Sequence, residues 1–318
     1  MMFNRRSLLP FLFVLFTLAG CASAYKDMTG FVLNMERRRA DLERKEVELP
    51  GGMRYVYLEG GQGEPLMLLH GFGGNKDNFT RVARYLTPQY RVIIPDHIGF
   101  GESTHYDDAD YTPSAQAERL HAFAQAIGLK NFHLGGNSMG GQIAMAYAAR
   151  YPGEIGSLWL LNPAGVLNAP RSELAKIFLE TGRNPLIARS EEDFAQTFAF
   201  VMSDPPFVPR PILNVLAQER IRNADLEERI FVQIATASVE NSVAGMKTPT
   251  LIVWGEHDRV IHVGTADVLH KLLPGSQVRI MQGIGHLPMV EAPKASANDY
   301  LRFRTALPQA ETAALSAK

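Results

Sequence analysis

Short runs of apolar residues alternate along the chain with longer segments in which apolar residues recur at helical spacing. A run such as 66–69, apolar at every position, is typical of a strand buried on both faces. The segment 114–129 instead gathers its apolar residues on one helical face and ends near Gly128. The same criteria predict strands at 47–49, 53–59, 66–69, 90–95, 132–135, 158–161, 250–254 and 278–281, and helices at 78–86, 114–129, 139–151 and 294–307.

The alternation of strands and helices predicts an α/β fold with a mostly parallel central sheet and helices on both faces. In such a fold, ligands bind at the carboxyl ends of the strands. The alternation stops between 170 and 245, where the sequence is helical and rich in Phe and Met. We therefore expect one main domain, formed by 47–169 and 246–308, with a helical cap inserted over 170–245 and a disordered tail over 309–318.

The first 24 residues have the pattern of a targeting segment or a membrane anchor. Arg5 and Arg6 precede an apolar run over 8–20, as in a secretory signal. The single cysteine, Cys21, ends this run in a sequence that resembles a bacterial lipobox, in which lipid attachment to the sulfur precedes cleavage. The alternative is an uncleaved signal anchor. Both place the remaining chain on a membrane and outside the cytoplasm, because the basic end stays inside. We expect a bacterial cell-envelope protein with its folded domain in the periplasm.

The next segment, 25–46, predicts a juxtamembrane amphipathic helix. Met28, Val32 and Met35 recur at helical spacing, and charged residues fill the rest. Such a helix can lie on lipid head groups. It can equally form a solvated stalk or pack on the folded domain, and it offers a surface for a homodimer, although nothing in the sequence requires one.

Composition and charge exclude several classes of protein. Among 318 residues, 46% are apolar, so the chain is not intrinsically disordered. Its 32 basic and 33 acidic side chains give a net charge of −1, which argues against nucleic acid as a partner. One cysteine rules out a disulfide framework and a cysteine-rich metal site. We expect no metal and no cofactor.

The first chemical motif is the segment 136–140, Gly-Asn-Ser-Met-Gly, which matches the pattern G-x-S-x-G. In a nucleophile elbow, Ser lies on a strained turn between a strand and a helix, and the flanking glycines remove side chains that would collide. The motif follows a predicted strand and precedes a predicted helix, which favours Ser138 as a nucleophile over a purely structural turn.

A glycine-rich loop, 70–74, follows the predicted strand 66–69. Backbone N–H groups in such a loop can face a developing oxyanion. We assign the oxyanion hole to the N–H groups of Phe72 and Met139. His70 precedes the glycines and can either brace the loop or line the substrate site.

Two further residues complete a candidate catalytic triad. Asp258 follows the predicted strand 250–254 and is our triad acid, with Glu256 as its rival. His286 follows the last predicted strand and is our general base. The chain order Ser, Asp, His is the order expected for a nucleophile elbow on an α/β sheet.

The predicted cap carries apolar side chains that suit two roles. They can pack onto the main domain, or they can form an apolar groove for an acyl chain. The residues in question are Phe194, Phe198, Met202 and Phe207.

Taken together, these motifs resemble the α/β-hydrolase superfamily from residue 49 to about residue 307. The segments 70–77, 136–141 and 162–165 are similar to bacterial lipolytic enzymes of family V and to abhydrolase-domain monoacylglycerol lipases. Membrane-anchored bacterial phospholipases A share the same order of anchor, helix and hydrolase domain. The resemblance implies hydrolysis of carboxylic esters in acyl lipids, with Ser138, Asp258 and His286 as the triad.

Two rival functions stay open. The elbow is also similar to that of meta-cleavage-product hydrolases, which cut carbon–carbon bonds, although a secretory anchor does not suit those cytoplasmic enzymes. A non-catalytic lipid-binding module that keeps the fold is the other rival, and the complete triad pattern argues against it.

Overall fold

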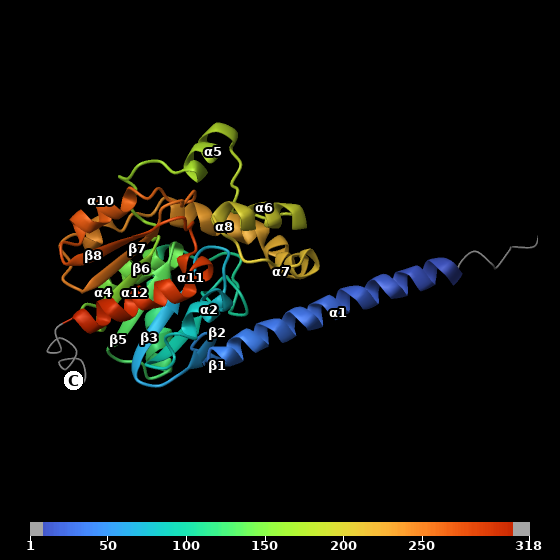
Figure 1. Cartoon of the computed structure of the whole chain (residues 1–318), viewed down its shortest axis with the longest axis horizontal. Coiled ribbons are helices and arrows are strands. Elements are labelled where there is room, and N and C mark those ends of the chain that lie inside the picture. The colour runs from blue at the N-terminus through green and yellow to red at the C-terminus, as the bar shows by residue number, and fades with distance from the viewer. Residues whose placement is uncertain (1–8, 308–318) are drawn as a thin grey trace, which may run out of the picture.

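The computed structural model describes residues 9–307, and it describes side chains from residue 24 onward. The predicted start of the targeting segment and the predicted disordered tail, 309–318, therefore lie outside the described residues, as does the side chain of Cys21. Figure 1 shows one body built around a sheet, with a long helix that projects away from it.

An eight-stranded sheet forms the centre of the protein, in the order β1-β2-β4-β3-β5-β6-β7-β8. Neighbouring strands from β4 through β3 to β8 are parallel, whereas β2 is antiparallel to both of its neighbours, β1 and β4. This confirms the predicted α/β-hydrolase fold with a mostly parallel sheet. The strands are β1 (Leu42–Leu49), β2 (Met53–Gly60), β3 (Glu64–Leu69), β4 (Tyr90–Pro95), β5 (Phe132–Asn137), β6 (Ile155–Leu161), β7 (Thr250–Gly255) and β8 (Ser276–Met281).

Each face of the sheet packs against helices through its own hydrophobic cluster. One cluster joins the sheet to α3, α4 and α10, and the other joins it to α2 and α12. The continuous apolar runs of β3 and β7 are buried because both of their faces are covered. The helices of the main domain are α2 (Thr80–Ala83), α3 (Pro113–Ala126), α4 (Met139–Arg150), α10 (Thr265–Leu272), α11 (Pro288–Glu291) and α12 (Pro293–Ala306). The 3-10 turn η1 (Lys76–Phe79) directly precedes α2.

Between β6 and β7 the chain forms the helices of the cap, which lie above the carboxyl ends of the strands in Figure 1. The cap is helical across the region where the strand–helix alternation stops in the sequence. Its helices are α5 (Glu173–Thr181), α6 (Glu191–Val201), α7 (Arg210–Arg222), α8 (Ala224–Ala235) and α9 (Glu240–Val243).

The N-terminal helix ends earlier, at its C-terminal end, than the sequence predicts. Helix α1 (Leu9–Arg39) stops before residue 46, and β1 takes residues 42–49. Asp41 makes the turn with φ of 53°. Every residue of β1 has a partner on β2, and these main-chain bonds outweigh the helical propensity of the charged segment 43–46.

Helix α1 is joined to the domain at its C-terminal end. It packs against α7 and α2, and Arg37 forms a two-bonded ion pair with Asp77, with both nitrogen–oxygen distances at 2.7 Å. Tyr25, Met28 and Phe31 remain exposed on the helix. Of the alternatives left open by the sequence, packing on the domain is therefore present for this end of the helix. Within the described residues, no helix combines the length and hydropathy needed to cross a bilayer.

Candidate active site

Ser138 lies on a sharp turn between β5 and α4. Its φ of 55° and ψ of −120° place it in a strained backbone region that a non-glycine residue rarely adopts. The flanking glycines are required by close packing: a Cβ at Gly136 would lie 2.3 Å from the carbonyl oxygen of Gly140, and one at Gly140 would lie 2.2 Å from that of Leu69. The geometry is that of a nucleophile elbow, as the motif predicts.

His286 and Asp258 form a hydrogen-bonded pair at the same end of the sheet. The His286 Nδ1 lies 2.8 Å from Asp258 Oδ2, and both side chains are nearly inaccessible to solvent. The other oxygen, Oδ1, accepts the main-chain N–H groups of Val260 and Ile261 at 2.8 and 3.0 Å. These bonds hold the carboxylate in place and leave Nε2 of His286 available to a proton donor.

The rival acid, Glu256, points elsewhere. Its carboxylate accepts the main-chain N–H of Gly283 at 3.1 Å, and the residue is exposed. The structure thus brings Asp258, and not Glu256, to the imidazole.

Two asparagines to which the sequence analysis gave no role hold the candidate triad residues in place. Asn162 donates its side-chain amide to Asp258 Oδ2 over 2.6 Å. Asn137, the residue before Ser138, donates to the main-chain oxygen of His286 over 3.0 Å. The sequence signals were that both lie in the motifs 136–141 and 162–165, and that each comes at the end of a buried strand, at the edge where ligands bind.

The predicted oxyanion loop lies directly against the elbow. A Cβ at Gly71 would lie 3.1 Å from the Cβ of Ser138. Within the described part of the chain, neither the Phe72 N–H nor the Met139 N–H donates to a protein acceptor. Met139 is the first residue of α4, where N–H groups have no partner inside the helix. Both groups are therefore available to an oxyanion.

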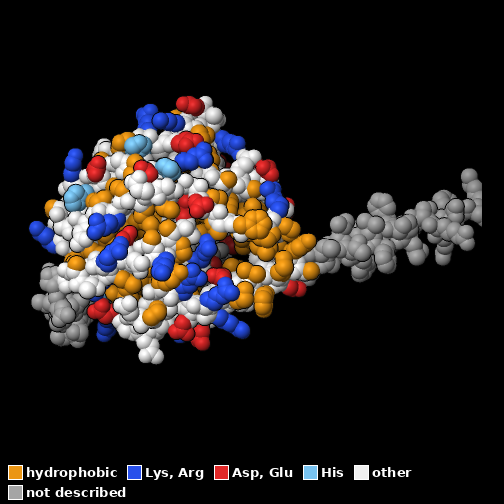
Figure 2. Space-filling view, viewed as in Figure 1, with side chains coloured by type: hydrophobic (Ala, Val, Ile, Leu, Met, Phe, Trp, Pro, Cys, Tyr) orange, Lys and Arg blue, Asp and Glu red, His pale blue; other side chains and the backbone are white. Residues whose placement is uncertain are grey.

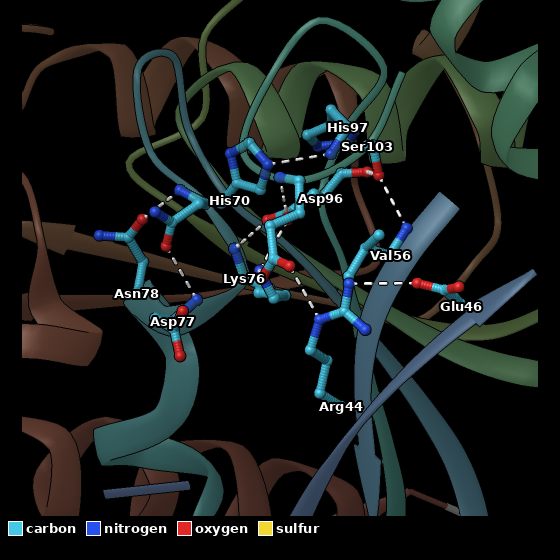
Figure 3. Close-up of polar contacts among 12 residues, drawn as sticks. Arg44, Glu46, Val56, His70, Lys76, Asp77, Asn78, Asp96, His97 and Ser103 are labelled. Atoms are coloured by element: carbon cyan, nitrogen blue, oxygen red, sulfur yellow. Dashed lines mark hydrogen bonds and ion pairs between the residues drawn. The ribbon is translucent and has the colours of Figure 1, made fainter. Parts of the chain in front are cut away.

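His70 braces this loop from inside the protein and is completely buried, so it does not line a substrate site. Its Nε2 accepts the main-chain N–H of His97 at 3.0 Å (Figure 3). The proton of the neutral ring is therefore on Nδ1, which donates to the Gly71 carbonyl oxygen at 2.8 Å. Burial lowers the pKa of His70 and keeps the ring neutral. The Gly71 carbonyl belongs to the same planar peptide as the Phe72 N–H, so the brace fixes the direction of that donor.

A buried ion pair joins Asp96 to Lys76, which lies shortly after the glycine-rich loop 70–74 in the chain (Figure 3). Asp96 is inaccessible to solvent and accepts both the main-chain N–H of Lys76, at 2.6 Å, and its Nζ, at 2.8 Å. Burial alone would lower the pKa of Lys76, but the charges of Asp96 and Asp77 outweigh it and raise the pKa. Lys76 therefore stays charged, and Asp96 stabilises the loop rather than lining the site.

The cap residues predicted to bind substrate are divided by the structure. Met202 is buried and lines a cavity beside Asp258, whereas Phe194 and Phe198 are half-buried on α6. Phe207 is 92% exposed and is not in the wall of that cavity, so its predicted contact with substrate stays a prediction. It lies in the proline-rich connection between α6 and α7, which keeps it outside the cap core.

Aromatic rings that the sequence did not single out pack beside the oxyanion loop. The Phe72 ring lies 5.5 Å from that of Phe231 on α8, and Phe231 lies 6.4 Å from Phe178 on α5. These rings join the loop to the cap by apolar contacts.

A cavity of about 640 Å³ lies between α5, the end of α6 and the loop that carries Asp258. Glu173 in its wall is paired with Arg259. Arg171 and Lys176, also in its wall, form no ion pair or side-chain hydrogen bond with another described residue.

Comparison with known proteins places this arrangement in a family. Residues 64–293 match the family model for the alpha/beta hydrolase fold. The chain is 46% identical to Lipase 1 of Psychrobacter immobilis, over 92% of this chain and 94% of that protein. It is 30% identical to human (Homo sapiens) monoacylglycerol lipase ABHD6, over 79% of this chain and 81% of that protein.

A solved structure supports the same family assignment. The crystal structure of a bacterial membrane phospholipase A superposes with a TM-score of 0.87 and 39% identity, covering 95% of this chain and 98% of that one. The likeness extends across the core and the cap. The chain thus belongs to the α/β-hydrolase fold family and is an ester hydrolase.

Proposed function

We propose that this protein is a membrane-tethered serine hydrolase that cleaves carboxylic esters of acyl lipids. The observation that carries the proposal is the His286–Asp258 bond of 2.8 Å at the strand ends, next to Ser138 on its strained elbow and to two unpartnered N–H groups. This combination of base, nucleophile and oxyanion donors serves acyl transfer.

The reaction proceeds in two halves. His286 Nε2 takes the proton from the Ser138 hydroxyl as Oγ attacks the ester carbonyl carbon, and Asp258 stabilises the resulting imidazolium. The N–H groups of Phe72 and Met139 hold the tetrahedral oxyanion. When the carbon–oxygen bond to the alcohol breaks, the alcohol takes the proton from His286. Water, activated by the same imidazole, then hydrolyses the acyl-enzyme to the carboxylic acid.

Acyl lipids are the proposed substrates. The relatives are a lipase, a monoacylglycerol lipase and a membrane phospholipase A. The apolar rings between the oxyanion loop and the cap suit an acyl chain.

One observation favours a phospholipid with an anionic head group over a neutral glyceride. The wall of the cavity beside Asp258 contains Arg171 and Lys176, which form no ion pair with another described residue, although the acidic residues Glu173 and Glu256 also line it. A phosphate group is the natural partner for such a pair of cations.

Attachment to a membrane is proposed from the N-terminal segment and from one face of the domain. Figure 2 shows hydrophobic side chains gathered where the described part of α1 leaves the domain. Tyr25, Met28 and Phe31 on α1 are exposed, and Phe207, just before α7, is more exposed than any of them. We propose that this face meets the lipid surface on the periplasmic side, with residues 1–24 as a lipoprotein signal or an uncleaved anchor.

The triad proposal is tested with the full chain and its Ser138→Ala variant on p-nitrophenyl butyrate, a monoacylglycerol and phosphatidylglycerol micelles. Loss of the nucleophile is expected to lower kcat by up to about 10⁶-fold and to abolish labelling by a fluorophosphonate. Ester cleavage that survives the substitution overturns the triad. If the wild-type protein cleaves no ester, turnover of a dienoate ring-fission product supports the carbon–carbon hydrolase, and lipid binding unaffected by Ser138→Ala supports the binding module.

The tether is tested by removing residues 1–24 only. A deletion through residue 46 would also remove Arg37 and more than half of β1, so it would disturb the fold. We expect the truncated protein to keep its activity on p-nitrophenyl butyrate and to lose activity on phospholipid vesicles. Equal vesicle activity in both proteins would contradict the tether.

A further inference from the structure

Arg220 on cap helix α7 is a buried guanidinium that contacts three separate segments. Its Nε lies 2.6 Å from Glu227 Oε1 on α8, and its Nη2 donates to the Leu186 carbonyl oxygen at 2.6 Å. Its Nη1 donates to the carbonyl oxygen of Gly73, in the oxyanion loop, at 3.0 Å. One side chain of the cap therefore holds the main chain of the catalytic loop.

The contact with the loop is close enough to dictate the residue at position 73. Gly73 has φ of +66°, and a Cβ there would lie 2.1 Å from Cζ of Arg220. Only glycine leaves the guanidinium room against the main chain at this backbone conformation.

The charge of Arg220 is balanced inside the cap. Glu227 is almost completely buried beside it. Burial raises the pKa of Glu227, and the guanidinium opposes that rise. A buried pair of this kind contributes little net stability over apolar residues of similar size, so packing of the cap alone gives no reason for an arginine here.

The loop's own geometry explains why the Gly73 carbonyl matters. The Gly74 N–H donates to the Gly71 carbonyl oxygen at 3.1 Å and closes a four-residue turn over 71–74. His70 holds the first peptide of this turn, which carries the Phe72 N–H, and Arg220 holds the Gly73 carbonyl at its far end. The guanidinium also lies over the Phe72 ring, 5.7 Å from its centre. The oxyanion donor lies between two fixed points, one in the core and one in the cap.

We infer that Arg220 is a positioning residue for the oxyanion hole: by holding Gly73, it keeps the Phe72 N–H in its catalytic direction only while the cap is docked. The inference rests on the proposed function, and it adds that the cap takes part in transition-state stabilisation as well as in covering the substrate. A displaced cap would then leave the triad intact and the oxyanion hole incomplete.

The test compares Arg220→Met and Arg220→Lys with the wild-type full chain on p-nitrophenyl butyrate. Rates are expressed per active site that a fluorophosphonate labels at completion, so that unfolded protein does not count. We expect Arg220→Met to lower kcat by about 10- to 100-fold, below the full loss of one oxyanion donor, with KM nearly unchanged. Arg220→Lys, which keeps the positive charge on a single donor nitrogen, should recover part of the loss.

Arg189→Gln is the matched control, because Arg189 is an exposed cap arginine paired with Asp225 and Glu228 of α8 and touches no catalytic loop. It should leave kcat and KM unchanged. If Arg220→Met leaves the protein unfolded, Gly73→Ala disrupts the same contact from the loop side and should lower kcat similarly.

An unchanged kcat per labelled site in these variants overturns the inference, and so does a rise in KM alone, which would indicate a substrate contact. Neither outcome affects the proposed function, which fails only if the wild-type chain cleaves no ester or Ser138→Ala still does.

Discussion

Asn162 and His286 bind the same oxygen of the same carboxylate. The amide nitrogen of Asn162 lies 2.6 Å from Asp258 Oδ2, and Nδ1 of His286 lies 2.8 Å from it. Asn162 also has φ of 47°, a left-handed backbone conformation that asparagine tolerates better than most residues. The Asn162 amide therefore fixes the position of the oxygen that orients the imidazole.

Replacing Asn162 by Gly should lower kcat about 10-fold, because glycine keeps the positive φ without strain and removes only the amide. Steady-state kinetics of the wild type and the variant at one pH check this effect. An unchanged kcat would contradict the role of Asn162.

Asp258→Asn should lower kcat by about 10⁴-fold, because an amide cannot stabilise the imidazolium and favours the wrong tautomer. Glu256→Gln is the matched control, since Glu256 bonds Gly283 and not His286. Its kcat should stay within about 2-fold of wild type. The reverse order of effects would make Glu256 the triad acid.

His70→Ala should lower kcat about 10- to 100-fold with little change in KM, because the Gly71–Phe72 peptide loses the donor that fixes its plane. His270→Gln serves as control for removing a histidine far from the site, where the ring contacts Ser276 on the α10–β8 side of the sheet. Thermal unfolding of each variant separates loss of fold from loss of rate. Equal kcat in the wild type and His70→Ala would contradict the proposal that His70 fixes the Gly71–Phe72 peptide.

The double substitution Arg171→Gln and Lys176→Gln should raise KM for phosphatidylglycerol about 10-fold, as expected for losing charge-assisted bonds to a phosphate. KM for a monoacylglycerol, which has no phosphate, should stay constant. The two substrates are assayed in the same neutral detergent. A matching rise for both would show that the cavity does not recognise the head group.

Stability should fall as the pH falls below the ordinary range of histidine. Burial and the nearby Arg304 lower the pKa of His133 to about 4, against the opposing effect of Glu64, and burial also lowers the pKa of His70 and His97. Between about pH 6.5 and about pH 4 the unfolded chain binds a proton at His133 that the folded protein does not, so His133 lowers the stability by up to about 1.4 kcal/mol per pH unit. Urea unfolding at about pH 7 and about pH 5 measures this. In the His133→Gln variant, the free energy of unfolding should change less between these two pH values. An equal change in the variant and the wild type would contradict the role of His133.

The chemistry of the site could be predicted from the sequence because its main residues lie in short local motifs. Ser138 has glycines on both sides, and Phe72 lies within a glycine-rich loop. Asp258 and His286 each follow a strand of the sheet, and parallel strands bring their carboxyl ends to one edge of the sheet. The structure adds their distances to this pattern.

Other contacts depend on chain segments far apart, which periodicity does not reveal. Asn162 bonds a residue 96 positions away, and Arg220 bonds one 147 positions away. β1 is a strand only because β2 lies beside it, since its own residues 43–46 are all charged. Phe207 belongs to the apolar set of the cap by composition, yet the chain between α6 and α7 turns it outward.

Helix α1 has 31 residues, or about 46 Å at 1.5 Å per residue, and its last turns are fixed to Asp77 and packed on α7. It therefore acts as a rigid arm and not as a flexible linker. If its first half lies in a membrane, the height of Ser138 above the lipid surface and the tilt of the cap are set by the direction of one helix axis. The enzyme would meet its substrate in one orientation, without a search over many.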